Sequence, residues 1–63
     1  MKEKTWLYDI FLDNGIVGDS GDLEFETKGE ALADAHDYII SELAEEYDRE
    51  ICEFEVKCYE RVV

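Results

Sequence analysis

The side chains that most often bind transition metals or act as nucleophiles are few in this chain: one histidine, His36, and two cysteines, Cys52 and Cys58. His36 has no second histidine to share a metal with, and the cysteines do not form a Cys-x-x-Cys pair. On an extended strand their spacing would place the thiols about 20 Å apart, which is too far for a shared metal ion or a disulfide. The spacing therefore predicts no metal site and two small buried hydrophobic residues.

Nucleophilic catalysis requires a base within hydrogen-bond reach of the attacking group. Besides the cysteines, the candidate nucleophiles are Thr5, Ser20, Thr27 and Ser41, and the single histidine falls midway along a predicted helix, at the edge of its apolar stripe. Carboxylates are abundant, but a domain of this size has little room for a cleft that would tune a catalytic pair. We predict that the protein is not an enzyme and uses no cofactor.

The segment from Asp13 to Asp22, DNGIVGDSGD, resembles a calcium-binding loop in composition. It lacks the alternating acidic ligands and the closing glutamate of such a loop. Turn formation accounts for its glycine, asparagine and aspartate residues without a metal ion. A calcium-dependent module is kept as a third hypothesis, which a calcium-induced rise in melting temperature would support.

Carboxylates are concentrated in the segment from Ala31 to Asp48, ALADAHDYIISELAEEYD, which carries six of them and no lysine or arginine. Those in the last turn of the expected helix oppose the helix dipole, and Arg49 is the nearest cation. With Glu30 included, the carboxylates are spaced by roughly 4 Å along the helix axis, close to the phosphate spacing of a single DNA strand. The pattern predicts either a solvated face or a surface that imitates nucleic acid, with partner contacts at Asp34, Asp37, Glu45 and Asp48.

Periodicity assigns these residues to three strands and one helix. Residues 5–12, 22–27 and 51–62 are apolar or alternate in polarity, which predicts strands. Residues 13–22 are expected to form the hairpin connection, with Ile16 and Val17 briefly extended. Thr27 and Glu30 have the spacing of a capping box, and an apolar stripe at helical spacing follows them: Leu32, Ala35, Ile39, Leu43 and Tyr47, with Ala31 and Tyr38 beside it.

The element order β-β-α-β predicts an α+β fold as one small acidic domain over residues 1–63. A right-handed crossover and a central position for the most apolar strand give a three-stranded antiparallel sheet with strand order 2-1-3. The helix is expected to pack on one face of this sheet. That face should hold Trp6, Tyr8, Ile10, Leu12, Phe25, Phe54 and Val56.

The opposite, open face of the sheet should expose an apolar strip in an acidic field. We expect Leu7, Phe11 and Tyr59 there, among acidic residues that include Glu24, Glu26, Glu53 and Glu55. Such a strip predicts either a homodimer or a basic partner with an apolar anchor. The alternative is that residues 15–22 fold back and partly cover Leu7 and Phe11.

Composition restricts the partners. The 63 residues include 18 acidic and six basic side chains, for a formal charge of −12, while 46% hydrophobic residues are enough for a folded core. The charge argues against direct binding of nucleic acid or of an anionic membrane surface. No apolar run resembles a signal peptide or a membrane span, so we expect a cytoplasmic protein.

The leading hypothesis is a small interaction protein whose acidic surface occupies a basic site on another protein, such as a nucleic-acid-binding protein. In size, charge and acidic helix the chain resembles, as a class, the small acidic inhibitors encoded by phages and mobile elements, such as DNA mimics and some anti-CRISPR proteins. That resemblance carries over no functional residue. The alternative hypothesis is a structural or accessory domain that self-associates through the open sheet face, with its charge serving solubility.

Overall fold

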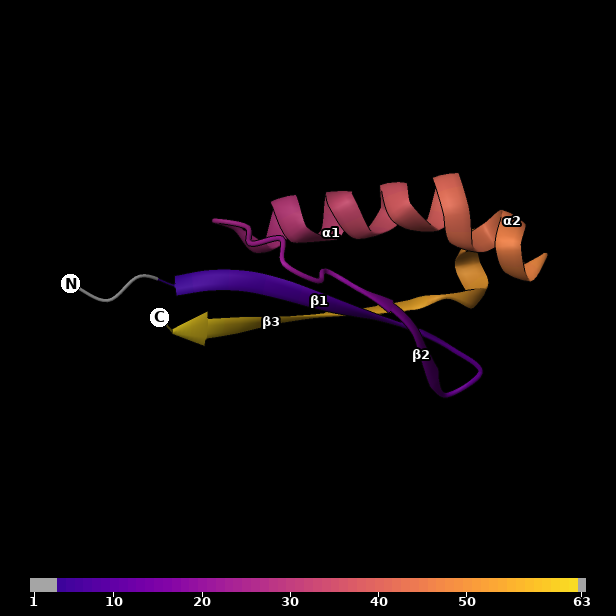
Figure 1. Ribbon diagram of the computed structural model, residues 1–63, viewed down its shortest axis with the longest axis horizontal. Helices are drawn as coiled ribbons and strands as arrows, with labels where there is room; N and C mark the ends of the chain where they lie inside the picture. Colours follow the sequence, from indigo (N-terminus) through magenta and orange to yellow (C-terminus); the bar gives the residue numbers. More distant parts are fainter. Residues whose placement is uncertain (1–3, 63) are drawn as a thin grey trace.

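The computed structural model describes residues 4–62 and contains a three-stranded sheet with one helical rod on one of its faces (Figure 1). The rod contains a five-residue π-helical segment, η1, between α1 and α2, and a 3₁₀ turn, η2, precedes the last strand. The elements in chain order are β1 (Lys4–Leu12), β2 (Gly15–Asp19), α1 (Lys28–Tyr38), η1 (Ile39–Leu43), α2 (Ala44–Tyr47), η2 (Ile51–Glu53) and β3 (Glu55–Val62).

The sheet has the strand order β2-β1-β3, and both neighbouring pairs are antiparallel. This confirms the α+β architecture and the strand order predicted from the sequence. β1 and β3 pair in a regular register from Lys4 opposite Val62 to Phe11 opposite Glu55. The pairing of β1 with β2 is interrupted by an irregularity between Ile10 and Phe11.

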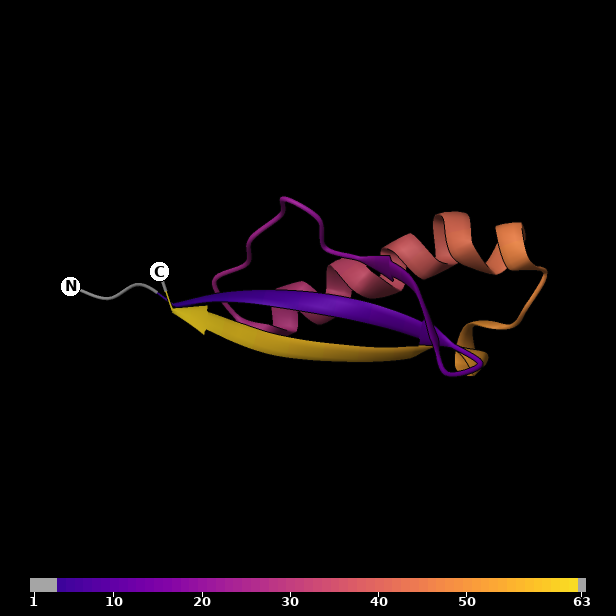
Figure 2. The same ribbon diagram turned by 60° about the horizontal axis from the view of Figure 1, so that its bottom comes forward.

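The predicted position of the second strand is wrong. β2 follows β1 after a tight turn at Asp13 and Asn14, whose φ angles are 52° and 70°. Positive φ at both central positions matches the twist of a hairpin, so the chain reverses there. Residues 22–27 instead lie in an arch that returns from β2 to α1 (Figure 2), paired with β1 through one bridge between Phe25 and Trp6.

The hydrophobic core lies between the rod and the predicted face of the sheet. Tyr8, Ile10, Leu12 and Phe54 are buried there against Ala31, Ala35, Ile39 and Leu43, and Trp6, Phe25 and Val56 pack around them. The predicted apolar stripe differs at both ends. Leu32 is half-buried and is not part of the core cluster, where Ala31 takes its place. At the other end Ala44 packs against the core whereas Tyr47 is exposed, because the wider turn of the π-helical segment rotates the residues that follow it.

The rod begins and ends with identifiable caps. The Thr27 hydroxyl accepts a hydrogen bond from the backbone N–H of Glu30 at 3.2 Å, which is the hydroxyl half of the predicted capping box. At the other end Asp48 adopts a left-handed conformation with φ of 54°, and the N–H of Arg49 donates to the carbonyl of Ala44. This cap turns the chain back towards the sheet.

Arg49 joins the tip of the β1–β2 hairpin to the turn before β3. Its guanidinium donates to both carboxylate oxygens of Asp13, at 2.9 and 3.1 Å, and its Nε donates to Glu53 at 3.0 Å. Glu53 also accepts from the backbone N–H of Glu50, which holds residues 51–53 in η2. β3 therefore begins at Glu55, and the prediction that Cys52 is buried on a strand is wrong, because Cys52 is exposed in η2.

Arg49→Gln tests this contact through its pH dependence. The hydrogen bonds and charge of Arg49 lower the pKa of Asp13, so the contact stabilises the fold above the unfolded-state pKa and is lost as pH falls through the folded-state pKa. We expect the pKa of Asp13, followed by NMR of its carboxyl carbon, to return towards its ordinary value in the variant. The difference in unfolding free energy between the native chain and the variant should shrink on acidification, and a difference independent of pH would contradict this account.

Gly18→Ala tests the packing of the rod on β2. A Cβ atom at Gly18 would lie 3.0 Å from Cε2 of Tyr38 and 3.3 Å from Cδ1 of the buried Leu43. We expect a loss of about 1 kcal/mol in unfolding free energy, because crowding outweighs the entropy gained by removing a glycine. Gly15→Ala is the matched control, since the nearest atom to its Cβ would be the Leu12 carbonyl oxygen at 3.7 Å. Equal denaturation midpoints for both variants would argue against close packing at Gly18.

Candidate functional site: an acidic groove between the rod and β2

The positive and negative side chains of the protein are segregated. The sequence has no lysine or arginine in residues 5–27 or 29–48. Arg49 is held by Asp13 and Glu53, and Arg61 contacts Glu24 at 2.7 Å. Within residues 4–62 the cations therefore lie at the starts of β1 and α1, at the hairpin tip and along β3, and they leave the side of the rod towards β2 negative.

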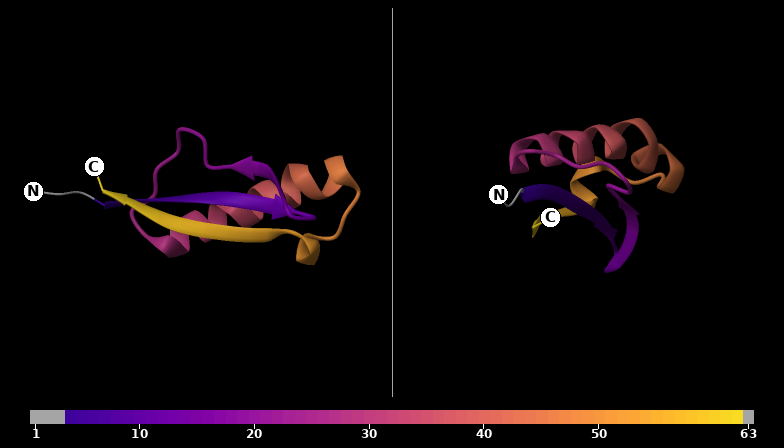
Figure 3. Two further views of the ribbon diagram at one scale, coloured as in Figure 1. Left: turned by 90° about the horizontal axis from the view of Figure 1, so that it is seen from below. Right: turned by 60° about the vertical axis from the view of Figure 1, so that its left-hand side comes forward.

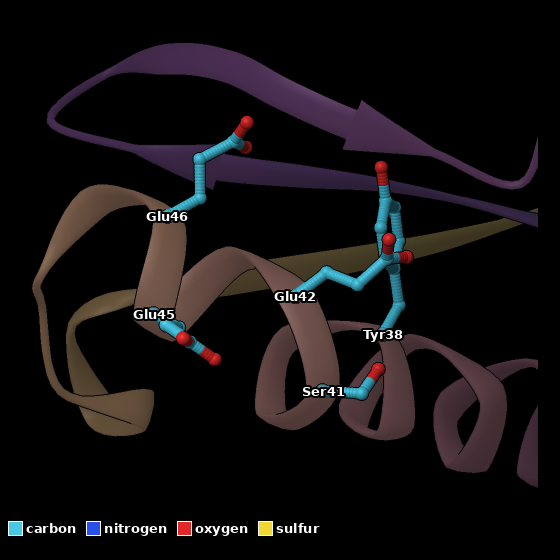
Figure 4. Close-up of a pocket in the computed structure, with 5 residues that line it drawn as sticks. All are labelled: Tyr38, Ser41, Glu42, Glu45 and Glu46. Carbon is cyan, nitrogen blue, oxygen red and sulfur yellow. The ribbon is translucent and has the colours of Figure 1, made fainter.

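Two adjoining hollows run along this negative side, and they share Tyr38, Ser41 and Glu42. The hollow nearer the end of the rod has a volume of about 440 Å³ and is lined in addition by Glu45 and Glu46 (Figure 4). The other, of about 380 Å³, is lined in addition by Tyr8, Asp19, Leu23, Asp34 and Asp37. Together they form what we call the acidic groove, whose carboxylates are Asp19, Asp34, Asp37, Glu42, Glu45 and Glu46.

Apolar surface lies inside this acidic groove. The ring of Tyr38 stands beside the side chain of Glu42 and extends towards β2 (Figure 4). Gly18 on β2 leaves room for this ring, because a Cβ atom at position 18 would lie only 3.0 Å from Cε2 of Tyr38. Leu23, in the arch after β2, is 52% exposed and lines the same groove. A ligand in the groove would therefore meet negative charge together with an aromatic and an aliphatic contact.

One groove carboxylate is fixed by the core. The hydroxyl of Tyr8 donates to Oδ2 of Asp34 at 2.7 Å, and the Tyr8 ring is buried and stacked on Phe25 with centroids 6.0 Å apart. Burial, followed by the hydrogen bond to Asp34, raises the pKa of Tyr8 well above its usual value. Asp34 thus has a structural role in the β1–α1 contact in addition to its charge.

The structure brings together most of the predicted helix residues but not all. Asp34, Asp37 and Glu45 line the acidic groove, whereas Asp48 forms the left-handed cap of the rod and is not among the residues that line it. Sequence reasoning missed Asp19, Leu23, Glu42 and Glu46. The misplaced second strand concealed Asp19 and Leu23, and the π-helical segment brings Glu42 and Glu46 to the side that faces β2.

The open face of the sheet is less apolar than the sequence predicted. Leu7 lies on this face but is only 7% exposed, so it offers a partner little surface. Phe11 is half-buried, with Nζ of Lys57 5.3 Å from its ring centroid. Tyr59 is 44% exposed and remains available.

The acidic residues predicted around this apolar strip are exposed, and two of them form ion pairs within the chain. Arg61, which is opposite Thr5 in the sheet, reaches Glu24 beside the Phe25–Trp6 bridge, so this ion pair spans β1. Glu53 is held by Arg49. Glu26 and Glu55 are exposed, and Glu55 lies opposite Phe11.

Within residues 4–62 no group of three or more histidine, cysteine, aspartate or glutamate side chains could hold a metal ion. His36 is exposed on α1. Cys58 is half-buried beside the core, and burial raises the pKa of its thiol, which favours the protonated, less nucleophilic form.

Tyr8→Phe separates the structural and electrostatic roles of Asp34. Removal of the hydroxyl leaves the carboxylate without its donor, and we expect a loss of about 1.5–3 kcal/mol in unfolding free energy, as is typical of a hydrogen bond to a charged group. Asp34→Asn keeps an oxygen that can accept from Tyr8, so it should cost less. Urea denaturation of both variants measures this difference, and a Tyr8→Phe variant as stable as the native chain would show that the bond contributes nothing.

Comparisons of the chain with protein-family models, with curated proteins and with solved structures give no match. None of the helices in residues 4–62 has the length and hydropathy of a membrane-spanning segment.

Proposed function

We propose that the protein is a small binding module whose acidic groove receives a cationic segment of another protein. The observation that supports this proposal is the segregation of charge: six groove carboxylates lie along the rod and β2. Residues 15–19 and 29–47 of these segments contain no lysine or arginine to neutralise them. A surface of one sign raises the association rate of oppositely charged partners and disfavours partners of like charge.

The shape of the acidic groove favours an extended or protruding partner. Both hollows are shallow and open to solvent, unlike the enclosed pockets that bind small molecules. Lysine and arginine side chains suit such a site, because their aliphatic stems can pack on Tyr38 and Leu23 while their charged ends meet the carboxylates. A basic segment with several such side chains is the ligand that these residues fit.

More specifically, we propose that the protein competes with nucleic acid for a basic site on a nucleic-acid-binding protein. Residues 34–46 span about 18 Å of helix, and their carboxylates follow one side of the rod as phosphates follow a strand. A nucleic-acid-binding protein presents lysine and arginine at this spacing. The module would then act as an inhibitor by occupying that surface.

A capture experiment with two matched variants tests the proposal. The groove variant carries Asp37→Asn, Glu42→Gln, Glu45→Gln and Glu46→Gln and leaves Asp34 in place because of its bond to Tyr8. The control variant removes the same charge elsewhere, through Asp22→Asn, Glu26→Gln, Glu30→Gln and Asp48→Asn. Each chain is immobilised, lysate is applied at low and at high salt, and retained proteins are identified by mass spectrometry.

We expect the native chain and the control variant to retain the same basic protein, and the groove variant to lose most of it. Retention should weaken at high salt, because exposed charges are screened over about 8 Å at physiological ionic strength. The native chain should also displace labelled nucleic acid from the retained protein. Equal retention by all three chains, or equal loss by both variants, would contradict a specific role for the acidic groove.

A further inference from the structure

The two edges of the sheet differ in how they are protected from other strands. β2 is five residues long, is paired irregularly with β1 and continues into the arch of residues 20–27. β3 is eight residues long, pairs with β1 without a bulge and forms the other edge along its whole length (Figure 3). Natural edge strands are usually kept short, bulged or interrupted by proline, and the chain contains no proline. β3 is therefore a long, regular edge to which another strand can add.

The hydrogen bonds of β1 define which groups β3 presents at this edge. Trp6 bonds to Phe25 and Tyr8 bonds to Ser20, so both direct their backbone groups towards the β2 side. Because backbone groups alternate along a strand, those of Leu7 point to β3 and meet Tyr59. The N–H and C=O groups of Val56 and Cys58 consequently point outwards.

β3 also differs from the rest of the protein in charge. Its sequence, EVKCYERV, balances Glu55 and Glu60 against Lys57 and Arg61, whereas the whole chain has a formal charge of −12. A second copy of the chain would be repelled by the acidic groove and by the rod. Two copies that meet at β3 experience less of that repulsion, because the charges of this strand balance.

We propose that β3 pairs antiparallel with β3 of a second copy, about a two-fold axis at Cys58, and so continues the sheet across a homodimer. In this register Glu55 of each chain faces Arg61 of the second copy. Lys57 of each chain faces Tyr59 of the second copy, which is 44% exposed in the single chain. The interface then contains two ion pairs and two contacts between an ammonium group and an aromatic ring.

The register follows from the alternation and the charges. Only shifts by two residues keep the outward groups of the two strands opposite each other. One such shift places Lys57 opposite Lys57 of the second copy, and the shift in the other direction places it opposite Arg61. Like charges directly opposite each other are destabilising, and larger shifts shorten the overlap of the two strands.

Charge exchange tests both the dimer and its register. Arg61→Glu and Glu55→Arg each place like charges opposite each other twice in a homodimer, so each variant alone should dimerise roughly tenfold or more weakly. A mixture of the two variants restores both ion pairs in a heterodimer, and so does the double variant in one chain. Sedimentation velocity from micromolar to millimolar concentration measures the association constants, and circular dichroism checks that each variant is folded.

Two control variants distinguish pairing through β3 from association through the open face of the sheet. Glu24→Gln frees Arg61 from its ion pair within the chain and leaves the proposed contacts, so it should dimerise at least as tightly as the native chain. Ile16→Ser removes an exposed apolar side chain from the open face, where Ile16 lies opposite Phe11, and should leave the dimer unchanged. A native chain that stays monomeric throughout, or a mixture that is no more dimeric than its components, would overturn the proposal.

Cross-linking provides an independent measure of the register. The Cα atoms of two opposed Cys58 residues would lie about 5.5 Å apart, within the range that a disulfide spans. In a Cys52→Ser chain, copper phenanthroline and oxygen should remove a proton and an electron from each Cys58 thiol and join the two copies through one disulfide. A chain with Cys58→Ser and Cys52 retained should cross-link far less, and equal cross-linking of both chains would argue against the register.

Discussion

The structure depends on the close contact between one side of the rod and one face of the sheet. Ala31 and Ala35 are fully buried at this contact, so the backbone of α1 lies near β1. Small side chains at such positions permit close packing, and a domain of this size has little other apolar surface to bury. The position of the rod in turn determines where its remaining side chains lie, and these include most of the groove carboxylates.

The basic residues are arranged to join segments of the chain rather than to neutralise the acidic surface. Arg49 holds the hairpin tip to η2, Arg61 spans β1 to reach Glu24, and Lys57 lies over Phe11. Each of these contacts connects parts that are distant in the sequence. Because Arg49, Lys57 and Arg61 are used in this way, these three side chains do not neutralise the groove carboxylates. The proposed cationic partner would supply the missing positive charge.

Local sequence patterns predicted the parts of the fold that bury regular apolar faces. The alternation in β1 and the helical spacing of Ala35, Ile39 and Leu43, with Ala31 beside it, identified most of the core. The same stripe wrongly included Leu32 and Tyr47, which are not part of the core cluster. They did not locate β2, because a strand that contains Gly15 and Gly18 has no alternating pattern of polar and apolar residues. The tight turn at Asp13 and Asn14 was missed as well, because it lies at the start of a longer run of glycine and other turn-forming residues.

The acidic groove was only partly predictable for a related reason. A periodicity of 3.6 residues places side chains correctly up to Tyr38, but no simple pattern marks the π-helical segment that follows. The sequence shows that residues 31–48 are acidic, whereas the tertiary contacts decide which carboxylates share one hollow. Leu23 belongs to this site only because the bridge between Phe25 and Trp6 holds the arch next to α1.

The two proposed surfaces are independent because the sheet separates them. The acidic groove lies on the β2 side and the dimer edge is β3, with β1 between them. Pairing through β3 would leave the two grooves near the two outer edges of one continuous sheet, related by a two-fold axis. A dimer of this kind presents two anionic sites at a fixed separation, which favours a partner that is itself two-fold symmetric or carries repeated basic segments, because the second contact then forms within one complex.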